Sequence, residues 1–164
     1  METKKIINNS IAGLFSAITI GVLTLLTYKT DYGLFLVASF GSTMVLLYGY
    51  PESPFAHPKN IFFGHLVTAT VGVIALTFIP LPEYVLIPIA VGLGVFFMIM
   101  FNVTHPPAGG NPIIVLVGGY SFEFIITPII TGCLLIIIQA FIINNYILKR
   151  KYKIWIYIIF APCI

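Results

Sequence analysis

Four long apolar segments decide what this chain can fold into. Residues 6–28, 60–79, 84–101 and 124–148 contain no Asp, Glu, Lys or Arg, and a membrane crossing takes about 20 helical residues. Charged residues make up 8% of the 164-residue chain, whereas soluble domains carry roughly 25%. A soluble fold of this length could not bury so much apolar surface. The sequence therefore predicts an all-α, multi-pass membrane bundle that forms one domain over residues 1–164.

Residues 104–112, THPPAGGNP, interrupt this pattern with a composition that the interior of a membrane helix does not tolerate. Proline removes a backbone N–H and clashes with the preceding turn, and glycine loosens the backbone. Because apolar segments flank the stretch, its backbone opens at a depth where lipid is expected. Irregular backbone at that depth needs a cover of protein or a water-filled cavity. The stretch is therefore a candidate functional site.

A second, weaker break lies 69 positions earlier, where Gly41-Ser42-Thr43 aligns with Gly110-Asn111-Pro112 and Gly49 with Gly118. Ser42 and Asn111 are common N-cap residues, so each is predicted to begin a short helix. Each short helix would rise about 12 Å, less than half of the roughly 30 Å hydrocarbon core. The sequence thus predicts two half-helices within an internal repeat, at about 6–79 and 84–148. Paired interrupted segments of this kind indicate a transporter binding site.

The N-terminus of a half-helix presents unpaired N–H groups and about half a positive charge. Two such ends that face one cavity would bind a small inorganic anion. The second half-helix is predicted to begin at Gly110 and Asn111, so the backbone donors there are the foremost candidates to bind the anion. The full set of candidate anion-binding or pathway residues is Gly41, Ser42, Thr43, His105, Pro106, Pro107, Gly109, Gly110 and Asn111.

Histidines add a second kind of candidate. His105 adjoins the second break, and because histidine titrates near neutral pH it would allow proton coupling or pH gating. The alternative is that His105 only bonds a backbone carbonyl and fixes the proline turn. Candidates for a vestibule are His57, Lys59, Asn60 and His65. For His65, packing inside the second span is favoured over lining a pathway, and His57 is expected to be solvated.

No signature of an enzyme or a metal centre occurs in the sequence. It contains no HExxH, GxSxG or Walker-type loop, and its three histidines lack the spacing of metal ligands. We therefore expect no catalysis, no metal and no cofactor. The basic residues around 149–153 follow an apolar segment, so anionic headgroups and membrane topology explain them better than nucleic acid does.

Basic clusters at both ends of the apolar region predict the orientation. Lys4 and Lys5 precede the first segment, and four basic residues follow the last. Such clusters stay in the cytoplasm, so both termini are predicted there, in a bacterial-type plasma membrane and with a retained first helix. Four spans with two re-entrant segments would make the repeats parallel, and six crossings would make them inverted. Residues 154–164 are too short to cross and are expected in the membrane interface.

Several of these stretches together resemble the HPP family of integral membrane proteins. They are GST at 41–43, VLL at 45–47, PESPFAHPKN at 51–60, GH at 64–65 and THPPAGGNP at 104–112, which holds the name-giving His105-Pro106-Pro107. The resemblance covers about residues 11–153 and implies a single HPP-type transmembrane domain with four spanning helices. GST and GNP stand where Gly-Ala-Ser and Ala-Thr-Ala runs look more typical of the family.

The resemblance implies transport of nitrite, as in chloroplast-envelope relatives. Nitrite fits the anion site predicted from the breaks, although nitrate, chloride or formate would fit it equally well. The leading hypothesis is a nitrite transporter or channel, and the alternative is a non-transporting membrane sensor or scaffold with a rigid HPP turn. Because four spans offer few faces to enclose a path, we expect a homo-oligomer, with a dimer favoured.

Overall fold

A computed structural model describes residues 2–152 of the chain, so the predicted interfacial segment 154–164 lies outside the described residues. Within residues 2–152 every regular element is helical. Four helical stretches are long and apolar enough to cross a membrane: α1 (Glu2–Lys29), α3 (Pro58–Phe78), α4 (Glu83–Met100) and the run over Ile125–Ile147. These stretches match the four apolar segments, so the predicted all-α membrane class is confirmed.

The last of these stretches is not one uniform helix. It consists of η4 (Ile125–Ile130), α6 (Thr131–Ile142) and the π-helical turn η5 (Ile143–Ile147). Thr127 has non-helical dihedral angles (φ −127°, ψ 111°) and precedes Pro128, so the helix is kinked near its start. A proline causes this kind of kink because it cannot supply the N–H of a helical hydrogen bond.

Two short helical segments lie between the long ones. The first joins α2 (Ala38–Met44) to the π-helical turn η1 (Val45–Gly49), and the second joins the 3₁₀ turn η3 (Pro106–Gly110) to α5 (Asn111–Gly118). They end at the two predicted glycines, and Gly119 stops α5 in a left-handed conformation (φ 63°). The order long, short, long therefore occurs twice, as the predicted repeat requires.

Of the two predicted half-helix starts, Ser42 is wrong, whereas α5 begins at Asn111 as predicted. α2 already begins at Ala38, so Ser42 lies inside it, and η3 leads into α5 so that the second segment begins at Pro106. Hydroxyl side chains can bond back to a carbonyl one turn earlier, as Thr68 does to Gly64 (2.9 Å), so a Ser or Thr residue does not stop a helix. Prolines are tolerated at a first turn, where their missing N–H costs nothing.

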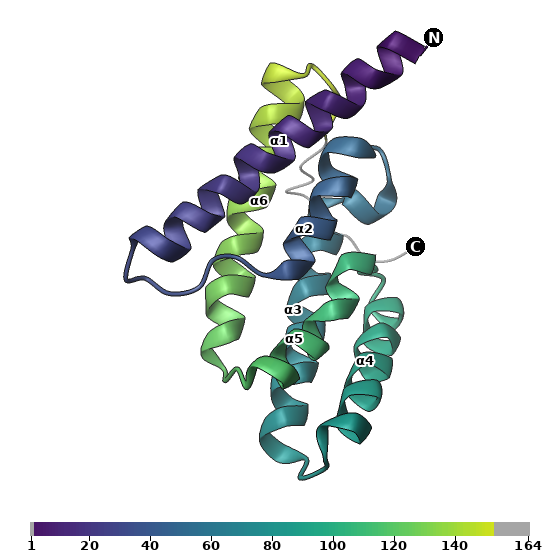
Figure 1. Cartoon of the computed structure of the whole chain (residues 1–164). Helices are drawn as coiled ribbons and strands as arrows, with labels where there is room; N and C mark the ends of the chain where they lie inside the picture. Colours follow the sequence, from purple (N-terminus) through teal and green to yellow (C-terminus); the bar gives the residue numbers. More distant parts are fainter. Residues whose placement is uncertain (1, 153–164) are drawn as a thin grey trace.

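Successive helices run in alternating directions in Figure 1: α1 downward, α2 upward, α3 downward, α4 upward, α5 downward and α6 upward. The second unit thus runs opposite to the first, which favours inverted over parallel repeats. α2 and α5 start close together in the middle of the molecule, because Ser39 in the first turn of α2 bonds Asn111 at the start of α5 (2.7 Å). From that point the two short helices run apart.

α3 is the central element, and glycine lets its neighbours approach. A Cβ added at Gly72 would lie 3.0 Å from the Cα of Pro112 in α5, and one at Gly94 of α4 would lie 3.3 Å from Thr68. Small residues at such contacts allow close helix packing in membranes. α1 lies at the edge of the bundle (Figure 1), and large apolar side chains along it are exposed, as expected of a surface in lipid.

Candidate functional site

A cluster of buried polar side chains lies where the two short helices begin. Each member is at most 5% exposed, and they come from α2, α3, the residue before η3 and α5. Polar groups are costly in an apolar interior unless they are hydrogen-bonded, so their pairing determines what the cluster can do. We call this cluster the polar network; it consists of Ser39, Thr43, His65, Thr68, His105 and Asn111.

His105 occupies one end of the network. Its Nδ1 lies 2.7 Å from the carbonyl oxygen of Phe55, which belongs to the short 3₁₀ turn η2 (Pro54–Ala56). A carbonyl can only accept, so Nδ1 carries a proton. In neutral His105 the other ring nitrogen, Nε2, is then an acceptor, and the Thr43 hydroxyl lies 2.9 Å from it. Thr43 therefore donates to His105.

His65 occupies the middle, and its tautomer follows from these bonds. Its Nε2 lies 3.2 Å from the Thr43 oxygen, and because the Thr43 proton points to His105, His65 must donate here. Its Nδ1 is then an acceptor and takes a hydrogen bond from the Asn111 amide at 3.0 Å. The Asn111 amide nitrogen also donates to the Thr68 hydroxyl (3.0 Å). The Asn111 side-chain oxygen accepts a hydrogen bond from the Ser39 hydroxyl (2.7 Å). Thr68 in turn donates to the Gly64 carbonyl (2.9 Å).

All donors and acceptors in this assignment are paired while both imidazoles are neutral. The two rings are 5.0 Å apart between centroids, and the edge of the Phe40 ring lies against His65 with the centroids 5.1 Å apart. A fully paired buried network holds its side chains in one arrangement. The site is therefore an ordered chain of hydrogen bonds that joins both halves of the protein.

The network includes only some of the residues predicted from the breaks. Thr43, His105 and Asn111 lie in it, and His65, which was expected to pack or to line a vestibule, is its centre. Gly41 and Ser42 are exposed on another face of α2. Pro106 is exposed, and Pro107, Gly109 and Gly110 are half-buried; a Cβ at Gly109 or Gly110 would meet nothing within 4 Å.

The backbone N–H of Asn111, one of the donors predicted to bind the anion, is not free. It bonds the Ala108 carbonyl within the continuous helical segment. At the true start of that segment Pro106 and Pro107 have no N–H, and the N–H of Ala108 bonds the His105 carbonyl (2.9 Å). The hydrogen-bond donors at this site therefore come mainly from side chains.

Apart from His65, the vestibule candidates lie where the loop that covers His105 enters α3. Nδ1 of His57 accepts from the N–H of Lys59 (3.2 Å) and so caps α3, while the Asn60 amide ties the loop by donating to the Pro54 carbonyl (2.9 Å). His57 is half-buried rather than fully solvated. Burial, and secondarily the charge of Lys59, lower the pKa of His57. At neutral pH His57 is therefore uncharged.

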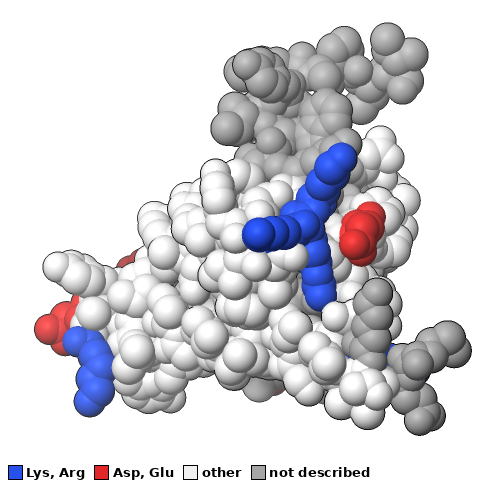
Figure 2. Space-filling model, turned by 90° about the horizontal axis from the view of Figure 1, so that it is seen from above, with Lys and Arg blue, Asp and Glu red and all other residues white. Residues whose placement is uncertain are grey.

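A cavity of about 310 Å³ lies on the outer side of this loop, lined in part by His57, Lys151 and Tyr152. Figure 2 shows basic side chains gathered beside an acidic one on this face, with a second basic and acidic pair at the far edge of the view. The Tyr152 hydroxyl donates to the Ala56 carbonyl (2.8 Å), and Arg150 donates to the Tyr48 carbonyl (3.0 Å). The basic segment after the last span thus holds the loop in place over the network.

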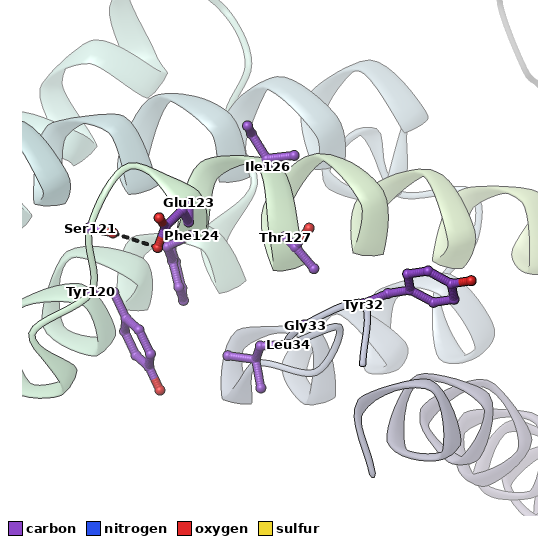
Figure 3. A pocket seen from close by; sticks show the side chains of 9 residues that line it. All are labelled: Tyr32, Gly33, Leu34, Tyr120, Ser121, Glu123, Phe124, Ile126 and Thr127. Atoms are coloured by element: carbon purple, nitrogen blue, oxygen red, sulfur yellow. Dashed lines mark hydrogen bonds between the residues drawn. The ribbon is translucent and has the colours of Figure 1, made fainter. Parts of the chain in front are cut away.

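A larger cavity, of about 410 Å³, lies at the other end of the molecule. Figure 3 shows that residues after α1, including Tyr32, and residues after α5, including Tyr120 and Glu123, line it. Glu123 accepts a hydrogen bond from Ser121 (3.0 Å). Each cavity is lined by one carboxylate, Glu123 here and Glu52 beside the loop, so the carboxylates do not distinguish the two as anion sites. Within residues 2–152 no group of three His, Cys, Asp or Glu side chains is placed to hold a metal ion.

Sequence reasoning missed Ser39, Thr68 and the Phe55 carbonyl. Ser39 stands four positions before Thr43 and Thr68 three positions after His65, spacings that place two side chains on the same helix face. That signal was available for both residues. The Phe55 carbonyl has no sequence signal, because a loop brings it to His105 from 50 positions away.

Fold and site together define a polytopic helical membrane protein with a polar network between two interrupted segments. The model of the HPP transmembrane region matches residues 1–153, so the chain belongs to the HPP family.

Two curated relatives are similar over most of the chain. A transmembrane protein of Dictyostelium discoideum is 36% identical over 152 residues, which cover 87% of this chain and 49% of the relative. A second one from the same organism is 34% identical over 127 residues, covering 73% of this chain and 45% of the relative. The chain thus spans about half the length of these relatives. No solved structure matches the chain.

Proposed function

We propose that this protein moves a small inorganic anion, with nitrite as the leading candidate, across the membrane through the polar network. The observation that carries the proposal is the position of the network, at the point where two oppositely running short helices begin. Ionisable residues inside a membrane bundle mark ion pathways more often than structure. Interrupted helices in corresponding halves are where transporters bind their substrates.

The chemistry of the network suits an anion. His65, His105, Asn111, Ser39 and Thr43 all carry N–H or O–H groups, and none of the six members is acidic. In the structure these donors bond one another. An anion therefore has to replace some of those bonds, and the loop over His105 has to move to admit it. Lys151 and Glu52 both line the outer cavity, so one positive and one negative side chain lie near this entrance.

A non-transporting sensor or scaffold is the second candidate. The observation that favours it is the complete pairing of the network, which a purely structural cluster would also show. In that case the hydrogen bonds only fix the HPP turn against α2 and α3. Measurement of anion entry into liposomes separates the two functions.

Purified protein in liposomes is expected to raise nitrite entry above that of empty liposomes between about pH 5 and 8, where histidine titrates. Nitrate, chloride and formate, measured in parallel, identify the preferred anion. Entry of all four at the rate of empty liposomes would remove the transport proposal and leave the sensor or scaffold.

Two further proposals concern the membrane orientation and the oligomeric state of the protein. We propose that both termini face the cytoplasm, and that the protein forms a homodimer. The described part of the basic tail, Lys149 to Tyr152, supports the first, because juxtamembrane basic residues stay inside. The relatives come from Dictyostelium discoideum, so they lend no support to a bacterial membrane.

A further inference from the structure

We infer that His105 binds one proton together with each anion, so that the network couples anion movement to proton movement. The inference rests on the proposed function, because it names the ion that travels with the anion at the same site. It begins from the contacts of the two nitrogens of His105.

His105 can take up a proton only at Nε2. Its Nδ1 already holds a hydrogen toward the Phe55 carbonyl. Proton binding at Nε2 forms an N–H bond there and displaces the hydrogen bond that Nε2 accepts from Thr43. The Thr43 hydroxyl has a second acceptor available, because the Ser39 carbonyl oxygen lies 3.1 Å away. Rotation of one hydroxyl therefore accommodates the added proton, and no covalent bond breaks in the protein.

His65 is a less suitable proton acceptor. Its free lone pair, on Nδ1, accepts from the Asn111 amide. Protonation there would place two N–H groups face to face unless the Asn111 amide turned over. That turn would also reverse the bonds to Ser39 and Thr68. The change needed at His65 thus breaks several hydrogen bonds, whereas the change at His105 redirects one.

The surroundings of His105 explain why an anion must accompany the proton. The groups that face it are the Phe55 carbonyl from η2, Thr43 from α2 and His65 with the Gly64 backbone from α3. None of these groups carries a negative charge. A buried, unpaired imidazolium is strongly unfavourable, so an anion that accepts from Nε2–H makes the proton-bound state accessible. One monovalent anion with one proton is electrically neutral.

The other titratable side chains on the packed elements are directed elsewhere. Tyr48 bonds Thr19, and the ring of His57 bonds the N–H of Lys59. Glu83 and Tyr84 lie in the first turn of α4, at the end away from η3, and are exposed. Lys59 lies at the start of α3, in the loop region outside the network. Glu52, in the loop before η2, is exposed and lines the outer cavity rather than the network. The anion is therefore the proposed counter-charge of His105.

Proton uptake on nitrite binding directly tests the coupling of the anion to a proton on His105. Sodium nitrite is added to the detergent-solubilised protein in weak buffer near neutral pH, and both bound nitrite and the pH change are measured. Because binding to only the protonated form draws protons from solution, we expect about one proton per bound nitrite. His105→Asn, whose amide can still donate toward the Phe55 carbonyl, should abolish the uptake. Glu83→Gln, which changes an exposed titratable group at the far end of α4, should leave the uptake unchanged.

Thr43 provides a second pair of variants that does not depend on the folding of His105→Asn. Thr43→Val removes, at constant shape, the hydrogen bond that proton binding at Nε2 displaces, so proton uptake with nitrite should extend to higher pH than in the wild type, and Thr43→Ser should restore the wild-type pH dependence. Nitrite binding without proton uptake would overturn the coupling and leave the transport proposal in place. Absence of nitrite binding would also overturn it, and the transport proposal would then depend on the liposome flux alone.

Discussion

Asn111→Leu is expected to lower the free energy of unfolding by about 2 kcal/mol or more, because two buried groups lose their partners at an estimated 1–3 kcal/mol each. These groups are the Ser39 hydroxyl, which donates to the Asn111 oxygen, and Nδ1 of His65, which accepts from its amide. Leucine has the same branched shape, with a larger volume, and suits a helix, so lost hydrogen bonds and some overpacking act in the same direction. Thermal and denaturant unfolding in detergent, followed by circular dichroism, measures the change.

The matched control is Asn9→Leu, which changes an exposed asparagine of α1 in the same way. Its stability should stay close to that of the wild type, since exposed sites without partners respond weakly to substitution. If Asn111→Leu unfolded at the same denaturant concentration as the wild type, the polar network would not have the hydrogen bonds described.

Gly64→Ala is expected to have the second large effect. A Cβ at this position would lie 2.9 Å from the Cβ of His105 and 2.9 Å from the Val103 carbonyl oxygen. One of these contacts is backbone, so a simple rotation of a side chain cannot relieve both. Overpacking of this kind costs about 1–3 kcal/mol, and it also pushes His105 away from Thr43. Both the unfolding midpoint and nitrite entry into liposomes should therefore fall.

Gly92→Ala separates this contact from the general effect of alanine in a helix. A Cβ at Gly92 of α4 would meet nothing within 4 Å, and alanine favours helix over glycine by about 1 kcal/mol. Gly92→Ala should therefore leave stability unchanged or raise it slightly. Equal responses of the two variants would argue against close packing of α3 on the HPP turn.

The spans were predictable from the sequence because one physical constraint decides them. A bilayer requires about 20 apolar helical residues per crossing, and the four segments satisfied it without any knowledge of packing. The ends of the short helices at Gly49 and Gly118 were predictable for a similar reason, since glycine ends helices through its backbone freedom. The start of α5 at Asn111 was also predictable, but the start of α2 was not, because Ser and Thr fit the first turn of a helix as well as the position before it.

The site was only partly predictable, because the sequence did not say which face of α2 turns inward. Ser39 and Ser42 lie three positions apart, yet Ser39 is buried against Asn111 and Ser42 is exposed. The choice depends on where the helix begins and on how it packs against α3. The role of His65 was underestimated for the same reason. Its neighbours in sequence are apolar, and its partners come from α2 and α5.

These two serines allow the central claim, that the buried network and not the exposed residues of the breaks carries the anion, to be measured. Nitrite entry is compared in liposomes that contain equal amounts of wild type, Ser39→Ala and Ser42→Ala. We predict that Ser39→Ala slows entry about fivefold, the equivalent of ~1 kcal/mol for one hydrogen bond, and that Ser42→Ala matches the wild type. Unchanged entry in Ser39→Ala together with slowed entry in Ser42→Ala would contradict the claim and place the pathway on the exposed face of α2.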